Sequence, residues 1–98
     1  MPVWTAVCRV SLRIASARSL KDKRQVARSL VDRIRRRFNA SVAEVEDQEV
    51  WSSLVLGIAA VSGSGQHASR QIEAVLEFIE VSHPEVEIME RHVELVSD

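Results

Sequence analysis

Residues 51–61, WSSLVLGIAAV, decide the fold because they form the most strand-like run in the chain. Apolar side chains occupy alternate positions on both sides of this run: Leu54, Leu56, Ile58 and Ala60 on one side, Trp51, Val55, Ala59 and Val61 on the other. A strand with this pattern is central in its sheet and largely covered on both faces. The run therefore predicts a central strand.

The segments before this strand predict a helix followed by a hairpin. Residues 40–47 are expected to form a strand, in which Val42 and Val45 are out of phase and leave the register open. The polar residues 47–49 predict the turn of the hairpin. From residue 20 to about residue 38 the apolar period is close to 3.6, which predicts an amphipathic helix. Ser19 is a favourable N-cap, and Asp22 stands at the reciprocal position of a capping box.

The two ends of the chain complete the pattern. Residues 3–14 alternate with a period of two, as in a half-covered strand. Residues 62–65, SGSG, break the chain before a second helix, whose core face is formed by Ala68, Ile72, Val75, Leu76 and Ile79. Pro84 ends this helix, because a residue before proline disfavours the helical conformation. A last strand is expected over 86–96, with a bulge where the alternation slips near residues 90–93.

The order βαββαβ predicts an α+β, ferredoxin-like split-βαβ sandwich with both helices on one face of a four-stranded antiparallel sheet. Right-handed crossovers place the first and third strands at its centre. The 98 residues make a single domain, residues 1–98, with a composition that is 46% hydrophobic and 28% charged. The sequence shows no signal peptide and no apolar run of membrane-spanning length, and Cys8 is its lone cysteine. These features predict a cytoplasmic protein without a membrane partner.

Charge is segregated along the chain. The segment 18–38 holds nine basic and two acidic residues, which gives about +7 and leaves close to −8 for the rest of the chain. Such a basic face usually meets phosphates, acidic surfaces or an acidic partner. On a helix, Lys21, Arg24, Arg28 and Arg35 share a strip about 60° wide beside the apolar stripe. Arg33, Arg36 and Arg37 gather at the C-terminal end, where the helix dipole also favours cations.

Two interpretations of this basic helix stay open. It either binds RNA phosphates, or it is paired with Glu73, Glu77 and Glu80 on the polar face of the second helix. The expected RNA or phosphate contacts are Lys21, Lys23, Arg24, Arg28, Arg35 and Arg36. Lys23 points toward the apolar side of the first turn, which also allows it a structural role.

The sheet face without helices predicts a second interface. Stacking aromatics of the kind found in RNA-recognition modules are absent from its two central strands. An apolar face is most simply covered by a second copy of the chain, so a homodimer is expected. Its predicted face consists of Val7, Trp51, Val55, Ala59 and Val61.

Chemistry-bearing patterns are not found. Gly63-Ser64-Gly65 lacks the lysine and hydroxyl residue of a phosphate-binding loop, and the three histidines have no metal-ligand spacing. No catalytic residues, metal or cofactor are predicted, and no sequence-specific DNA binding is expected. The chain is therefore interpreted as a non-enzymatic RNA- or ribosome-associated binding protein, with a homodimeric regulatory or small-ligand module as the alternative.

Several stretches resemble the YlxP-like family of small bacterial proteins. They are SLKDKR at 19–24, Phe38-Asn39, SVAE at 41–44, Trp51, and GIAAVS at 57–62. The resemblance implies a ferredoxin-like fold and no established catalytic residues. Genes of the family often lie beside those for translation initiation and ribosome maturation factors, which implies a role near the ribosome or RNA. Lys21, Lys23 and Arg24 match the family's helix-opening motif and are the first choice of contact residues.

Overall fold

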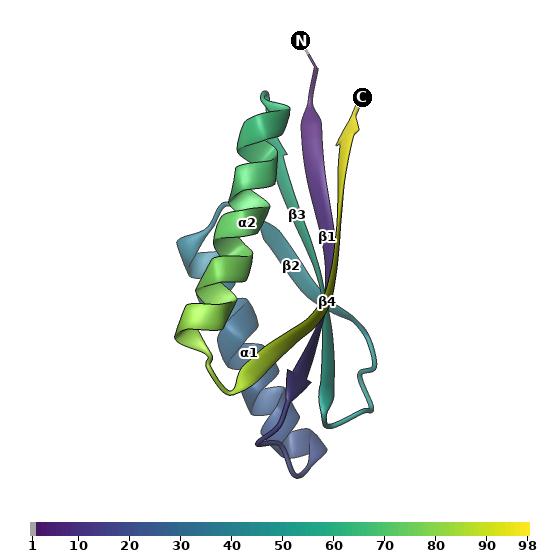
Figure 1. The fold of residues 1–98 in the computed structure, drawn as a ribbon, viewed down its shortest axis with the longest axis vertical. Coiled ribbons are helices and arrows are strands. Elements are labelled where there is room, and N and C mark those ends of the chain that lie inside the picture. Colours follow the sequence, from purple (N-terminus) through teal and green to yellow (C-terminus); the bar gives the residue numbers. More distant parts are fainter. Residues whose placement is uncertain (1) are drawn as a thin grey trace.

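The computed structural model describes residues 2–98, and its elements follow the order βαββαβ (Figure 1). The strands are β1 (Trp4–Ile14), β2 (Ser41–Glu46), β3 (Ser53–Ser62) and β4 (Val86–Ser97), and the helices are α1 (Leu20–Arg37) and α2 (Gly65–Ser82). The strands pair antiparallel in the order β2-β3-β1-β4. The ferredoxin-like prediction is confirmed, with the first and third strands at the centre.

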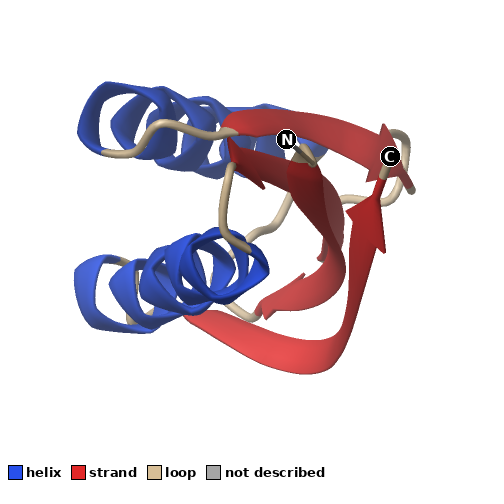
Figure 2. Cartoon of the chain, turned by 90° about the horizontal axis from the view of Figure 1, so that it is seen from above, coloured by secondary structure: helices blue, strands red, loops and turns tan. Residues whose placement is uncertain are grey.

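Both helices cover the same face of a twisted sheet (Figure 2). The core forms between them because β1 sends every second side chain, from Ala6 to Ile14, toward the helices, where they are buried. Leu30 and Ile34 of α1 and Ile72 of α2 meet them there. The helices are displaced along the long axis, so that α2 covers the half of the sheet nearer the termini and α1 the other half (Figure 1). Within residues 2–98, neither α1 nor α2 combines the length and the apolar composition that a membrane-spanning helix needs.

The helix start signals act largely as expected. The Ser19 hydroxyl accepts a hydrogen bond from the Asp22 N–H at 3.1 Å, and Ser64 caps α2 in the same way through the His67 N–H. The Asp22 carboxylate departs from the capping-box geometry, since it accepts from the N–H of Arg18, one residue before the cap, at 3.0 Å. α2 ends at Ser82, two residues before Pro84, as predicted.

A β-bulge explains why the register of β2 could not be assigned from the sequence. Glu44 is opposite Leu56 and Glu46 is opposite Val55, so Val45 is an extra residue in the strand. Val42 faces the core, whereas Val45 lies 46% exposed. The irregularity in β4 lies between Ile88 and Glu90, slightly before the residues predicted for it. β3 begins at Ser53, which leaves Trp51 in the β2–β3 turn.

Candidate nucleic-acid interface

Lys23 is a buried anchor between α1 and the β2–β3 hairpin. Its side chain is 1% exposed, and its Nζ lies 2.9 Å from Oε2 of Glu44 on β2. The same ammonium group donates a hydrogen bond to the backbone carbonyl of Asp47 at the turn. A lysine this deeply buried is stable only when its charge is paired and hydrogen-bonded, as it is here. Lys23 therefore positions the first turn of α1, and it is not accessible to a phosphate.

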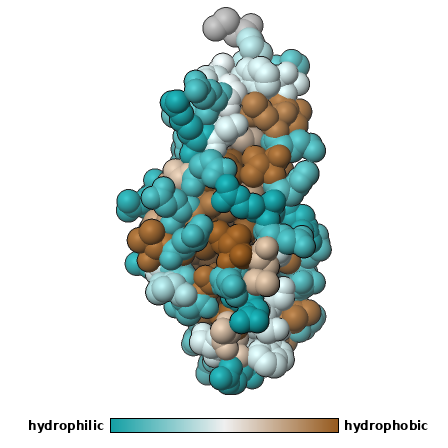
Figure 3. All heavy atoms as spheres, viewed as in Figure 1, coloured by the Kyte–Doolittle hydropathy of each residue, from teal (hydrophilic) through white to brown (hydrophobic). Residues whose placement is uncertain are grey.

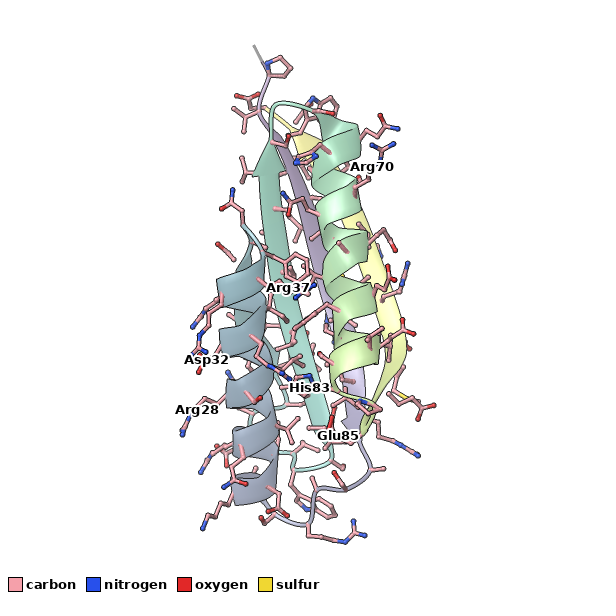
Figure 4. All side chains as sticks on the ribbon, turned by 90° about the vertical axis from the view of Figure 1, so that its left-hand side faces the viewer. Arg28, Asp32, Arg37, Arg70, His83 and Glu85 are labelled. Carbon is pink, nitrogen blue, oxygen red and sulfur yellow. The ribbon has the colours of Figure 1, made fainter. Side chains whose placement is uncertain are left out.

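The other cations of the predicted strip are exposed. Lys21, Arg24, Arg28 and Arg35 present their side chains to solvent on the side of α1 that borders the edge strand β2. Arg35 donates to the Val42 carbonyl at 2.9 Å, which ties the end of the strip to β2. In Figure 4, Arg28 points away from the body of the molecule. The structure thus brings these four predicted residues together along one border, with Glu44 and Asp32 beside them.

Two of the three predicted acidic residues of α2 lie away from α1, whereas Glu77 lines the same groove as Arg37 without forming an ion pair with it. Glu73 forms an ion pair with Arg91 of β4, with carboxylate oxygens 2.7 and 3.0 Å from Nη2. Glu80 borders a hollow at the C-terminal end of α2 together with Pro84 and Glu85. Across residues 2–98, no ion pair joins any arginine of α1 to a carboxylate. The acidic residues of α2 therefore do not neutralise the strip by direct ion pairing.

The remaining cations of α1 continue around its exposed side. Arg33, Arg36 and Arg37 are all exposed. Arg36 projects between the strip and the side of α1 that faces α2, since successive residues are rotated by about 100°. Figure 4 shows Arg37 in the space between the two helices. The cations thus form a band from the β2 border, across α1, to the border with α2.

His83 links the two helices at the lower end of this border. The Ser82 hydroxyl donates to the Phe78 carbonyl at 2.7 Å, so it accepts from Nδ1–H of His83 at 2.8 Å. Nε2 of the neutral ring then faces the Ser29 hydroxyl of α1 at 3.4 Å. Burial lowers the pKa of His83, the nearby Arg33 lowers it further, and Glu85 partly opposes both effects.

We expect His83 to make the fold less stable in mildly acidic solution. Because its folded-state pKa lies below the ordinary value of about 6.5, the unfolded chain binds a proton first as the pH falls. The urea midpoint of the wild type should therefore fall between pH 7.5 and 5.5. H83Q, which stays neutral and can keep both hydrogen bonds, should show a smaller fall. Equal pH dependence in the two proteins would contradict this role of His83.

The open sheet face carries part of the predicted dimer surface. Val7 and Ala59 are opposite each other on the central strands, and Val61 next to them is 58% exposed. Val55 is 2% exposed within one chain, so it offers no surface to a partner. Trp51 is half exposed, but it lies beyond the other end of β3 from Val61, about 30 Å away along the strand.

The structure adds valines to this face that the sequence did not single out. Val45 reaches it through the bulge and packs over Gly57, where an added Cβ would lie 2.9 Å from a Val45 methyl group. Val96 joins it from β4, opposite Thr5. Hydrophobic side chains are also visible among polar ones on the side of the molecule that carries β4 (Figure 3). The same open face carries a bidentate ion pair of Arg9 with Glu46, at 2.8 and 2.9 Å.

Residues 2–98 contain no group of three or more His, Cys, Asp or Glu side chains arranged to hold a metal ion. Cys8 is buried in the core, and burial raises the pKa of its thiol.

Comparisons with known proteins agree with the sequence pattern and the fold. The chain is 40% identical over 74 residues, 76% of its length and 79% of the relative's, to the "Uncharacterized protein YlxP" of Bacillus subtilis (strain 168). Two solved structures resemble it in fold. The de novo designed protein Foldit4 has a TM-score of 0.52 and 13% identity, over 96% of this chain and 98% of that chain. The de novo designed protein LFR1 1 with ferredoxin fold has a TM-score of 0.53 and 15% identity, over 95% of this chain and 83% of that chain. A family model described as "Protein of unknown function (DUF503)" matches residues 5–93. The chain therefore belongs to this YlxP-like family of small proteins of unknown function.

Proposed function

We propose that the protein binds structured RNA, that of the ribosome included, through phosphate contacts made by the exposed cations of α1. The observation that supports this most is that none of the arginines of α1 has a carboxylate partner within residues 2–98. Surface ion pairs are weak, but a band of unpaired guanidinium groups on one helix raises the local potential. Guanidinium groups also bind phosphate oxygens in a bidentate manner.

The anchoring of α1 supports the same proposal. Lys23 ties its first turn to the hairpin and Arg35 ties its last turn to β2, so the cations between them are held on a rigid element. A rigid row of cations loses less conformational freedom on binding a phosphate backbone than cations on a mobile loop. The strip can therefore follow the regular spacing of phosphates on a folded RNA.

A salt titration tests the proposal. Phosphate contacts release counterions, and each lowers the slope of log affinity against log salt concentration by about 0.7–0.9. For the four cations of the strip we expect a slope of about −3, measured with a structured RNA and with purified ribosomal subunits between 50 and 300 mM salt. Absence of binding at 50 mM salt, or a slope near zero, would reject phosphate recognition by α1.

A second proposal concerns the open sheet face, which we infer to be the interface of a homodimer. The exposed valines Val7, Val45, Val61 and Val96 on this face support it, because such a surface is most simply covered by a copy of itself. Both faces can act together, since a dimer joined through its sheets presents two α1 helices.

Light scattering tests the dimer. At micromolar concentration the wild type should have twice the chain mass of 11.0 kDa, and V61E should have that of one chain. The matched control is V81E, which places the same charge on a 76% exposed valine of α2, away from the sheet. A monomeric wild type, or equal masses for V61E and V81E, would contradict the proposed interface.

A further inference from the structure

A groove with aromatic walls lies between the C-terminal end of α1 and the C-terminal half of α2. Its volume is about 300 Å³, within the lower range of ligand pockets. It opens to solvent on the helical side of the molecule, where Figure 4 shows Arg37 between the two helices. Its walls are formed by Arg37, Phe38, Ala74, Glu77, Phe78 and Val81.

The rings and the guanidinium group of this groove are already arranged for stacking. Phe38 and Phe78 meet edge to face, with 5.5 Å between ring centres and 71° between ring planes. The Cζ atom of Arg37 lies over the Phe78 ring, 5.2 Å from its centre. One face of the Phe78 ring is thus covered by the exposed side chain of Arg37. Aromatic faces and arginine planes are the two protein surfaces on which unpaired bases stack.

Charge makes this groove continuous with the cations of α1. Arg33 lies one turn before Arg37 on the same side of the helix, and Arg36 lies between them and the strip. Glu77 is at the wall of the groove. Its carboxylate repels a phosphate but accepts hydrogen bonds from amino groups of a base. The groove therefore suits the base of a nucleotide, and Arg33 and Arg36 suit the phosphates beside it.

We propose that an unpaired RNA base displaces the Arg37 guanidinium group from the Phe78 ring, stacks on this ring between α1 and α2, and is covered on its other face by the displaced guanidinium group. The proposal rests on the proposed function, because the phosphates that lead to this base are held by the cations of α1. It adds to that function a preference for RNA with unpaired bases. Bases inside a duplex have both faces covered by their neighbours, so the groove selects loops, bulges and ends over paired RNA.

The first test changes the RNA and leaves the protein intact. The probes are a fluorescent hairpin with a four-nucleotide loop, the same hairpin with abasic loop nucleotides, and a duplex with an equal number of phosphates. At constant low salt we expect the hairpin to bind about tenfold more tightly than the other two. Equal affinity for the hairpin and its abasic form would overturn base insertion, whatever the role of the strip.

The second test changes the groove. F78L keeps an apolar side chain but removes the stacking ring, and it should reduce hairpin affinity about 5- to 10-fold while leaving duplex affinity unchanged. M89A, which shortens an exposed apolar side chain of β4 outside the groove, is the control, and circular dichroism checks the fold of both variants. The proposal would be overturned if F78L lowered the affinities for hairpin and duplex equally, or if it changed neither affinity. Absence of binding to any RNA would instead reject the proposed function itself.

Discussion

K23A is expected to lower the free energy of unfolding by about 3 kcal/mol, the range seen when one partner of a buried ion pair is removed. For a domain of this size that corresponds to a fall in Tm of about 15 °C. The loss has a clear physical cause. Oε2 of Glu44 is buried and has no partner besides Lys23 in residues 2–98, so the variant leaves a desolvated carboxylate oxygen in the fold. The Glu44 side chain is 25% exposed, and water reaching it keeps the cost near the lower end of the range.

The hairpin should also lose order in K23A. Asp47 has φ of 58°, in the left-handed region that disfavours an L side chain, and its carbonyl accepts from Lys23. Without the ammonium group the turn loses its tie to α1, and this carbonyl keeps one of its two hydrogen bonds, the one from the Val50 amide. The amide of Val50, which donates to the same carbonyl at 3.0 Å, should therefore exchange faster with solvent.

Two variants separate this anchor from a general effect of charge. K21A removes an exposed lysine from the same turn and should change the free energy of unfolding by less than about 0.5 kcal/mol. K23M keeps the buried aliphatic volume and should fall between K21A and K23A. Chemical denaturation of all three measures these differences. A K23A variant as stable as K21A would show that the buried pair does not anchor α1.

The position of Lys23 illustrates what the sequence can and cannot predict. Helical periodicity places it on the apolar side of the first turn, which allows it a structural role. Its partner could not be identified, because Val42 and Val45 have opposite parity and the sequence alone does not show that Val42 and Glu44 share the side facing the helices. Local periodicity determines which face a side chain takes, whereas a bulge appears in a period-two pattern only as a break and does not show at which residue the register shifts.

The surroundings of α1 show the same limit, because contacts between elements depend on how the elements pack. The strip on its β2 side could be predicted, since it depends only on rotation within one helix. The partners of the acidic residues of α2 could not be predicted, because the pairing of Glu73 with Arg91 depends on how α2 lies over β4. The Phe38–Phe78 pair was missed for the same reason, since the longitudinal offset of the two helices brings these rings together. The one available signal was an aromatic residue, Phe78, beside the predicted core face of the second helix.

R24E/R28E is expected to weaken binding of structured RNA by about 100-fold at 50 mM salt. Both side chains are exposed, project from the centre of the strip and have no ion-pair partner in the described chain. The double reversal removes two attractive contacts with phosphate and replaces them with two repulsive ones. At about 1–1.5 kcal/mol for each position, the effects sum to roughly two orders of magnitude in affinity. The slope of log affinity against log salt concentration should become shallower by the contribution of about two phosphate contacts.

A matched reversal decides whether the position or the total charge matters. R13E/R70E changes the net charge by the same amount, but Arg13 is on β1 and Arg70 lies near the start of α2, far from Arg28 in Figure 4. General repulsion between protein and RNA acts on both double variants, whereas loss of a binding strip acts on R24E/R28E alone. Filter binding or fluorescence anisotropy therefore compares the two at equal salt. Equal weakening by both would leave net charge as the cause. An R24E/R28E protein that binds as the wild type does would exclude the centre of the strip from the RNA interface.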